Sequence, residues 1–174
     1  MPEQPTNIPT LHTPRQTLRG FIPADFEPLC AILGDRDVLR YLPRTEPYPP
    51  EAVQRIMRHQ ANHWEKYGFG WYALADRSTG ELIGWCGLGV LDETGETEIK
   101  YLLKKTHWGC GLASEGAQFC VEAGFHQQKL HAIIGLVHPE NIASRRVLEK
   151  CGLSYQDRVH YWGMDLDRLI RYKE

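Results

Sequence analysis

The segment Trp108-Gly109-Cys110-Gly111-Leu112-Ala113 is the part of the sequence whose residue types most clearly indicate binding chemistry. It joins a stretch with strand character to a run with helical periodicity. Glycines at positions 109 and 111 remove side chains where a ligand would approach the backbone. The start of a helix offers unpaired backbone N–H groups and the positive end of the helix dipole. Together these features favour a loop that binds a phosphate or a pyrophosphate.

Two other nucleotide-binding motifs do not match this loop. A Walker loop requires Lys-Ser or Lys-Thr after its last glycine, where this chain has Leu112-Ala113. A dinucleotide fingerprint requires a third glycine at position 114, which is Ser114. Two glycines at a helix start also occur in plain tight turns, so the neighbouring elements must decide. A nucleotide-binding α/β domain remains an alternative, and it predicts stabilisation by ATP or NAD.

The residues around the loop alternate between strand and helix patterns. Alternating or continuous apolar runs bounded by turn residues predict strands, and apolar residues at helical spacing predict helices. Strands are expected over residues 15–22, 71–76, 82–91, 96–103, 131–137, 153–161 and 164–172. Helices are expected from Pro23, around Val38, from Pro50 to Gly68, after the glycine loop, and from Asn141 to Gly152.

The order of these elements predicts the fold class. Strand, helix, strand, helix, strand from residue 96 onward implies a βαβ crossover, so the strands around Leu102 and Ile134 should be parallel. The earlier hairpins should be antiparallel. We therefore expect a single α+β domain in three α/β layers. It has a mixed, mostly antiparallel central sheet, a parallel crossover at the glycine loop, and helices on both faces.

The composition is that of an ordinary globular chain. The 174 residues are 42% hydrophobic and 24% charged, with a formal net charge of −2, which fits one domain. Residues 1–12, which are polar and rich in proline, are expected to form a flexible arm, and residues 13–174 the domain. Neither a basic patch, a long apolar run nor a signal peptide is evident. We expect no nucleic-acid or membrane partner, a cytoplasmic location, and a monomer or homodimer.

Two other groups of residues are weaker candidates for chemistry. His59 and His63 have a spacing that metal sites use, but no third ligand is evident, so a solvated helix face and no metal are expected. The five cysteines contain no CxxC pair, and buried free thiols are expected except at Cys110.

Further segments extend the pattern of the loop. The loop is preceded by Glu98-Ile99-Lys100-Tyr101-Leu102-Leu103 and continues as Ser114-Glu115-Gly116. Downstream lies Asn141-Ile142-Ala143-Ser144-Arg145-Arg146-Val147-Leu148-Glu149-Lys150-Cys151-Gly152-Leu153, and upstream lie Thr13-Pro14-Arg15-Gln16-Thr17-Leu18-Arg19 and Asp37-Val38-Leu39-Arg40-Tyr41-Leu42. In this order and spacing the segments resemble the GNAT superfamily of N-acetyltransferases, over residues 13 to about 165. Trp108, where the family usually has Gln or Arg, is typical of its RimJ- and RimL-like ribosomal-protein N-terminal acetyltransferase branch.

The resemblance implies a reaction and a co-substrate. An acetyl group would pass from acetyl-CoA to a primary amine, either a protein N-terminal α-amine or a small-molecule amine, by direct attack within a ternary complex. It implies backbone contacts of the strand with the acetyl carbonyl and the pantetheine arm, loop N–H groups on the pyrophosphate, and side chains of the last helix on the arm and sulfur. The residues concerned are Leu102, Leu103, Trp108, Gly109, Cys110, Gly111, Leu112, Ala113, Asn141 and Ser144.

Glu98 and Ser144 are the candidate catalytic residues. Glu98 is the candidate general base, directly or through water, although a solvated strand residue is the alternative. An α-amine has a pKa near 8 and is about one-tenth neutral at pH 7, whereas a lysine near 10.4 is far less so. A single carboxylate therefore suits the α-amine better. Many family members carry a tyrosine acid where this chain has Leu148, so Ser144 is expected to hydrogen-bond the leaving sulfur instead.

The missing tyrosine leaves a second interpretation open. The same fold could serve as a non-catalytic module that binds or senses acyl-CoA. Coenzyme A should stabilise the protein in both cases, but only an enzyme releases free thiol when an amine is added.

Overall fold

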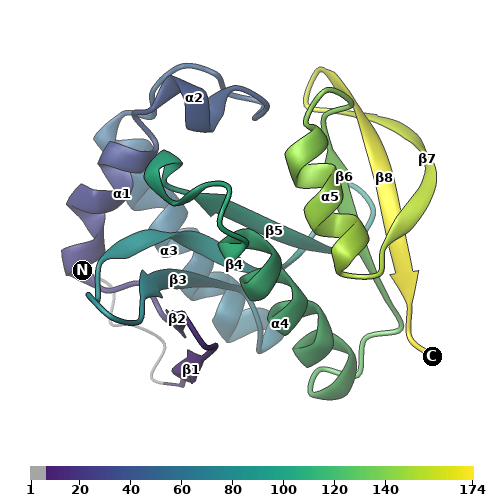
Figure 1. Cartoon of the computed structure of the whole chain (residues 1–174), viewed down its shortest axis with the longest axis horizontal. Coiled ribbons are helices and arrows are strands. Elements are labelled where there is room, and N and C mark those ends of the chain that lie inside the picture. The colour runs from purple at the N-terminus through teal and green to yellow at the C-terminus, as the bar shows by residue number, and fades with distance from the viewer. Residues whose placement is uncertain (1–6) are drawn as a thin grey trace.

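The computed structural model describes residues 7–174. One mixed sheet has the strand order β1-β2-β3-β4-β5-β6-β8-β7 (Figure 1). The strands are β1 (Leu11–His12), β2 (Gln16–Arg19), β3 (Trp71–Asp76), β4 (Leu82–Val90), β5 (Thr97–Leu103), β6 (Ala132–Val137), β7 (Ser154–Tyr161) and β8 (Met164–Tyr172). The helices are α1 (Phe26–Ile32), α2 (Arg36–Leu39), α3 (Pro50–Tyr67), α4 (Leu112–His126) and α5 (Ile142–Lys150). Short 3-10 turns η1 (Pro23–Asp25) and η2 (Lys105–His107) precede α1 and the glycine loop.

The helix boundaries follow local signals in the sequence. Pro50 occupies the first turn of α3, and Gly68 ends the helix in the left-handed conformation at φ 73°, as expected for an N-terminal proline and a C-terminal glycine. Asn141 caps α5, because its side-chain oxygen accepts the backbone N–H of Ser144 at 3.2 Å. These boundaries confirm the sequence prediction.

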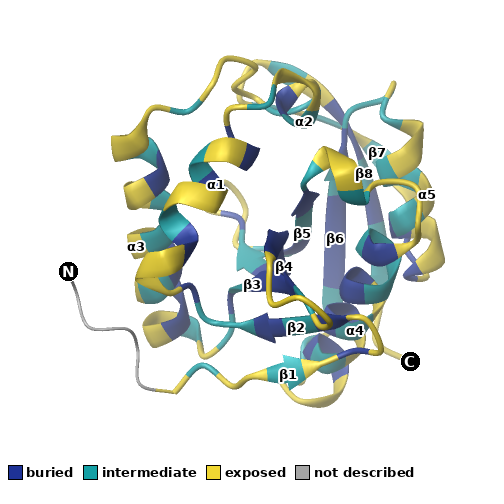
Figure 2. Ribbon diagram, turned by 60° about the vertical axis from the view of Figure 1, so that its left-hand side comes forward, coloured by how far each residue is buried: buried dark blue, intermediate teal, exposed yellow. Residues whose placement is uncertain are grey.

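Helices cover both faces of the sheet, as predicted. One core lies between the sheet and the α4 and α5 layer, and includes Ile83, Val121 and Leu148. The other lies on the face covered by α1 and α3, and includes Leu29 and Val53. In Figure 1, α3 lies behind the sheet and α4 in front of it. Figure 2 shows the buried residues concentrated in the sheet and the exposed ones on the outer sides of the helices.

The only parallel pairing within the described residues joins β5 and β6, and it is recorded at one register position, Glu98 opposite Ile134. The β4–β5 pairing, in contrast, runs without interruption from Gly84–Leu103 to Val90–Thr97. Beyond Glu98 the two parallel strands diverge, which Figure 1 shows. We call the opening between the C-terminal parts of β5 and β6 the seam.

The last two residues of the arm predicted over residues 1–12 belong to the sheet. Leu11 and His12 form β1, pairing with Leu18 and Thr17 of β2, so the sheet begins inside the predicted arm. Residues 1–6 lie outside the described part of the chain. No helix between residues 7 and 174 has the length and apolar character needed to cross a membrane.

Candidate active site

The glycine loop has the backbone conformation that its sequence predicts. Gly109 and Gly111 have positive φ angles of 76° and 80°, a region that residues with a Cβ atom rarely adopt. A Cβ atom on Gly109 would meet nothing within 4 Å. Gly111 is the N-cap of α4, so the loop delivers its backbone directly to the first turn of that helix. This geometry supplies N–H donors and open space for an anion.

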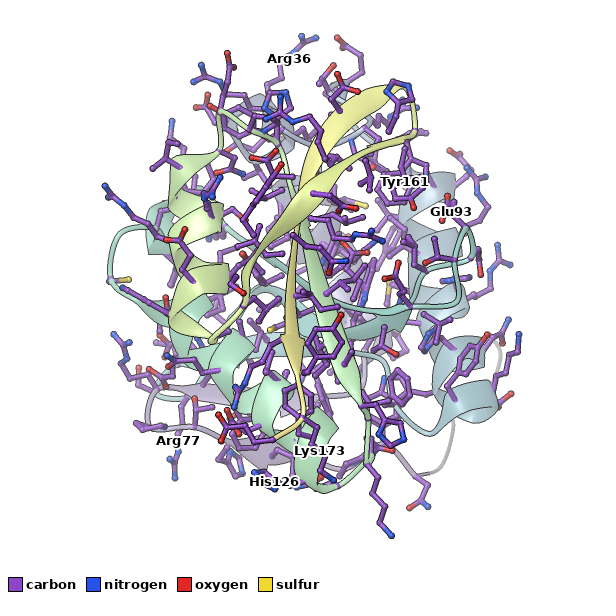
Figure 3. All side chains as sticks on the ribbon, turned by 90° about the vertical axis from the view of Figure 1, so that its right-hand side faces the viewer. Arg36, Arg77, Glu93, His126, Tyr161 and Lys173 are labelled. Atoms are coloured by element: carbon purple, nitrogen blue, oxygen red, sulfur yellow. The ribbon has the colours of Figure 1, made fainter. Side chains whose placement is uncertain are left out.

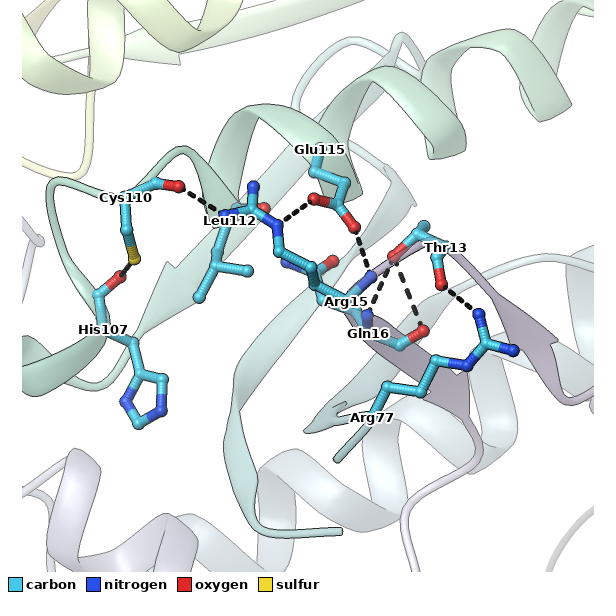
Figure 4. Close-up of polar contacts among 8 residues, drawn as sticks. All are labelled: Thr13, Arg15, Gln16, Arg77, His107, Cys110, Leu112 and Glu115. Atoms are coloured by element: carbon cyan, nitrogen blue, oxygen red, sulfur yellow. Dashed lines mark hydrogen bonds and ion pairs between the residues drawn. The ribbon is translucent and has the colours of Figure 1, made fainter. Parts of the chain in front are cut away.

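Arg15 holds this loop from the N-terminal side, as Figure 4 shows. Its Nη1 donates to the carbonyl oxygen of Cys110 at 2.7 Å, and its Nε donates to Glu115 of α4 at 2.7 Å. The neighbouring Gln16 donates from Nε2 to the carbonyl oxygen of Leu112 at 2.7 Å. In a trans peptide unit the C=O and the next N–H point in opposite directions. The contact with Cys110 therefore fixes the direction of the Gly111 N–H.

Beyond Glu98, the edge of β5 that faces β6 has no recorded strand partner among the described residues. Leu91 donates its N–H to Glu96, and Lys104 donates its N–H to Ile83, so the even-numbered residues of β5 pair with β4. Because antiparallel pairing alternates along a strand, the backbone groups of Leu103 face the seam and those of Leu102 face β4.

Two of the predicted coenzyme residues lie at the entrance to this edge. The indole nitrogen of Trp108 donates to the carbonyl oxygen of Leu103 at 2.8 Å, and the residue is 47% exposed. Cys110 is exposed, and its thiol contacts the carbonyl oxygen of His107 at 3.1 Å. The strand end and the start of the glycine loop are therefore joined through one indole.

Ser144 is connected to β5 through a residue that sequence reasoning missed. The hydroxyl of Tyr101 lies 2.8 Å from both the Oγ atom and the carbonyl oxygen of Ser144. Burial, the largest effect, raises the pKa of Tyr101 well above its ordinary value. Such a phenol stays protonated at neutral pH and is a poor proton donor to a thiolate. The Tyr101 hydroxyl therefore links β5 to Ser144 at the start of α5. No local motif marks this tyrosine.

The position of the missing tyrosine is occupied by a core residue. Leu148 is 1% exposed. Its side-chain carbons lie 2.5 Å and 2.7 Å from the point where a Cβ atom on Gly135 of β6 would be. Leu148 thus fills the space above a glycine of the sheet and contributes to packing.

Glu98 is buried at the point where β5 and β6 pair. The residue is 4% exposed, so the solvated alternative is wrong. Its Oε2 atom forms an ion pair with Lys100 Nζ at 3.2 Å and has no other partner among the described residues. Burial is the largest influence and raises the pKa of Glu98, while Lys100 and the backbone of Leu136 on β6 lower it. A carboxylate with a raised pKa is a stronger base than an exposed one.

Aromatic side chains line the same face of the sheet as Glu98. Trp71 stacks on Trp85, with ring centroids 5.1 Å apart and an interplanar angle of 17°. From the β7–β8 turn, Trp162 donates its indole N–H to Glu93 at 2.7 Å. Figure 3 shows the adjacent Tyr161 on the same side of the molecule as Glu93. The turn between β7 and β8 and the turn between β4 and β5 therefore border one region.

His63 differs from its prediction. It is buried, not on a solvated face, and its ring is bonded at both nitrogens. Nε2 accepts the N–H of Val90 at 3.1 Å, so Nδ1 must be the donor to the carbonyl oxygen of Phe69 at 2.7 Å. Burial, its largest influence, lowers the pKa of His63. The histidine is thus a neutral structural link between α3 and the sheet. No group of three possible metal ligands occurs in the described range.

Comparisons with known proteins agree with this geometry. The model of the GNAT acetyltransferase domain matches residues 15–154. The uncharacterized N-acetyltransferase p20 of Bacillus licheniformis is 36% identical over 149 residues, which are 84% of this chain and 82% of that protein. The structure of an acetyltransferase from Agrobacterium tumefaciens str. C58 has a TM-score of 0.85 and 27% identity, with 96% of each chain covered.

The fold of the RimL branch is also similar. The structure of RimL, a ribosomal L7/L12 α-N-protein acetyltransferase in complex with coenzyme A, has a TM-score of 0.80 at 15% identity, covering 95% of this chain and 98% of that one. At this identity the likeness concerns the fold alone.

The chain therefore belongs to the GNAT acetyltransferase family. It is an N-acetyltransferase that depends on acetyl-CoA, and the predicted family and fold class are confirmed.

Proposed function

We propose that this enzyme acetylates a primary amine, either a protein N-terminal α-amine or a small-molecule amine, by direct attack of the amine on acetyl-CoA within a ternary complex. The observation that carries the proposal is the position of Glu98. Its carboxylate is buried at the single β5–β6 register pair, where the seam begins. A base at this place can take the proton of an amine that approaches a thioester lying in the seam.

The residues present fit coenzyme A. We assign the pyrophosphate to the backbone N–H groups of residues 109–113, where glycines with positive φ leave room for an anion. We assign the pantetheine arm to the seam edge of β5, including Leu103, and to Asn141. Acetyl-CoA supplies the thioester, and the chain contributes binding, orientation and a base.

The acceptor's basicity decides how much work Glu98 must do. Burial raises the pKa of Glu98. The pKa of the base therefore lies closer to pH 7, and closer to the pKa near 8 of an α-amine, than that of an exposed carboxylate. A lysine amine near 10.4 would demand a much stronger base. The site therefore suits α-amines and other weakly basic primary amines.

Ser144 is assigned to the departing thiol. Its Oγ atom lies 2.8 Å from the Tyr101 hydroxyl, whose own proton is donated to the Ser144 carbonyl oxygen at 2.8 Å. The Ser144 O–H therefore donates to the sulfur by turning away from Tyr101. A thiol of this kind has a pKa near 8.5, so its thiolate is only weakly basic and one hydrogen bond suffices.

A thiol-release assay tests the proposal. The protein is incubated with acetyl-CoA and a panel of amines that includes peptides with different first residues. Release of free coenzyme A with matched acetylation of the amine, detected by mass spectrometry, is the expected result. If the coenzyme stabilises the protein against heat but every amine is silent, the protein is a non-catalytic acyl-CoA binding module and the proposal is wrong.

A further inference from the structure

Lys100 is the cation next to the proposed base. Its Nζ atom lies 3.2 Å from Glu98 Oε2. The same ammonium lies 5.6 Å from the ring centroid of Trp71 and 5.1 Å from that of Trp162. Both distances are within the range of attractive cation–π contacts. One charge therefore contacts a carboxylate and two indoles from three different elements.

The two indoles that hold Lys100 are themselves fixed. Trp71 stacks on Trp85, and the Trp162 N–H is bonded to Glu93. A lysine side chain is usually flexible, but this one is confined between two anchored rings and is only one-third exposed. The ammonium is thus held at a defined place beside Glu98.

The surroundings of Glu98 make this cation necessary. A buried carboxylate without compensation favours its neutral form. Of the groups that face Glu98, Glu93 opposes ionisation, whereas Lys100 and the Leu136 backbone support it. His63, from the helix packed on this face, is neutral because both its ring nitrogens are engaged. Lys100 is the positive charge that faces this carboxylate.

We propose that Lys100 is a positioning residue that keeps Glu98 ionised and holds its carboxylate in place where the seam begins, and that the resulting ion pair selects weakly basic acceptors. This inference rests on the proposed function. The pair is neutral as a whole, so it offers an incoming alkylammonium ion no net attraction. Lys100 instead presents a like charge, which disfavours a second cation nearby. A weakly basic amine avoids this repulsion because it arrives uncharged far more often.

Three variants separate charge from structure. Lys100→Met removes the charge and keeps an apolar stem, and Lys100→Arg restores the charge. Lys104→Met is the matched control, because Lys104 also pairs with a glutamate, Glu81 at 2.5 Å, but on the exposed surface. The rate constant kcat/KM is measured from pH 5.5 to 9 at saturating acetyl-CoA with one acceptor, so the acceptor's own ionisation is common to all profiles.

The acid limb of the Lys100→Met profile should move to higher pH by about one unit or more, which lowers kcat/KM by about tenfold at pH values below the pKa of Glu98. Lys100→Arg and Lys104→Met should keep the wild-type limb. The preference for an amino-acid amide, with a pKa near 8, over an alkylamine, with a pKa near 10.5, should narrow in Lys100→Met only. The proposal is overturned if Lys100→Met leaves both the acid limb of the pH profile and the preference between the two amines unchanged. It is also overturned if a folded Lys100→Arg variant behaves like Lys100→Met.

A titration that needs no acceptor tests the same assignment. The carboxyl carbon of Glu98 is followed by ¹³C NMR, with Glu98→Gln identifying its signal. Titration at a higher pH in Lys100→Met than in the wild type supports the proposal, and coincident curves contradict it. If no amine in the panel causes thiol release but Lys100→Met still shifts the titration of Glu98, the proposed function is contradicted and Lys100 remains the partner of Glu98.

Discussion

The proposed coenzyme loop is made of backbone groups, whereas the proposed acceptor side is made of side chains. The loop uses the backbone of one continuous segment, residues 108–113, at the start of α4. The acceptor side uses side chains brought together by the sheet and its turns, including Glu98 and Lys100 of β5, Trp71 of β3 and Trp162 of the β7–β8 turn. The first depends on local conformation and the second on tertiary structure.

Because the loop and the acceptor side use different residues, coenzyme binding and the chemical step should be separable by mutation. A change in the loop should weaken coenzyme binding and leave the chemical step intact. A change on the acceptor side should slow the chemical step and leave coenzyme binding intact. Variants that mix the two effects would show that the sides are not separate.

Glu98→Gln should have the largest effect. The amide keeps the size of the side chain and removes the base, so kcat/KM for an amine should fall by roughly 100- to 1,000-fold. Coenzyme affinity, measured by calorimetry, should stay within about twofold of the wild type because no part of the loop changes. Glu65→Gln, at an exposed position of α3, is the control. If Glu98→Gln keeps the turnover of the wild type, Glu98 is not the general base.

Gly109→Ala should raise the KM for acetyl-CoA by about tenfold with little change in kcat. A Cβ atom at a positive φ costs about 1–2 kcal/mol and narrows the approach to the loop N–H groups. Gly80→Ala is a close match, because Gly80 has φ 75° and a Cβ atom there would also meet nothing within 4 Å. The two variants should lose similar stability in urea unfolding. An equal rise of KM in both would attribute the effect to strain and not to the loop.

The stability of the protein should decrease as the pH falls below about 6.5, through His63. Burial lowers the pKa of His63 in the folded state, so below the unfolded value near 6.5 the unfolded chain binds more protons and folding becomes less favourable. The expected loss is about 1 kcal/mol between pH 7.5 and 5.5, measured by urea unfolding. His63→Gln should be less dependent on pH over this range, whereas His131→Gln, at an exposed position, should behave as the wild type.

Ser144→Ala should have the smallest effect, a fall in kcat of about threefold at saturating coenzyme. The loss corresponds to one neutral hydrogen bond to the leaving sulfur, worth roughly 0.5–1 kcal/mol. Tyr101→Phe keeps the Ser144 hydroxyl and should reduce kcat less. An unchanged kcat in Ser144→Ala would show that the hydroxyl does not assist the leaving group.

The features that depend on local conformation could be predicted from the sequence almost completely. Pro50 and Gly68 mark the ends of α3, Asn141 marks the cap of α5, and the glycines of the loop mark its positive φ angles, because each effect acts within a few residues. The parallel crossover followed from the order of elements and the preference of chain connections. The extent of β1 was missed because a two-residue strand has no periodicity to detect.

The contacts between residues far apart in the sequence could not be predicted in the same way. Arg15 contacts a carbonyl oxygen 95 residues further along the chain, and no spacing rule connects the two. Tyr101 and Ser144 lie 43 residues apart in the sequence and meet only through the tertiary packing of α5, which contacts α4 and β6. His63 was expected at the surface because the helix pattern does not reveal that its two ring nitrogens bind Phe69, in the α3–β3 connection, and Val90, at the end of β4.

The single register pair between β5 and β6 also has a consequence for the mechanics of folding. It divides the sheet into a five-stranded part, β1 to β5, and a three-stranded part, β6 to β8. Helix α4, which packs against β4, β5 and β6, and the Tyr41–His138 ring contact at 5.1 Å bridge the two parts.

A coenzyme arm that pairs with the free edge of β5 would act as an additional strand between these parts. The amides of β6 should then exchange their hydrogens more slowly when acetyl-CoA is bound, and the two parts should unfold as one cooperative unit. For this protein, loading the co-substrate would be the last step in assembling the sheet.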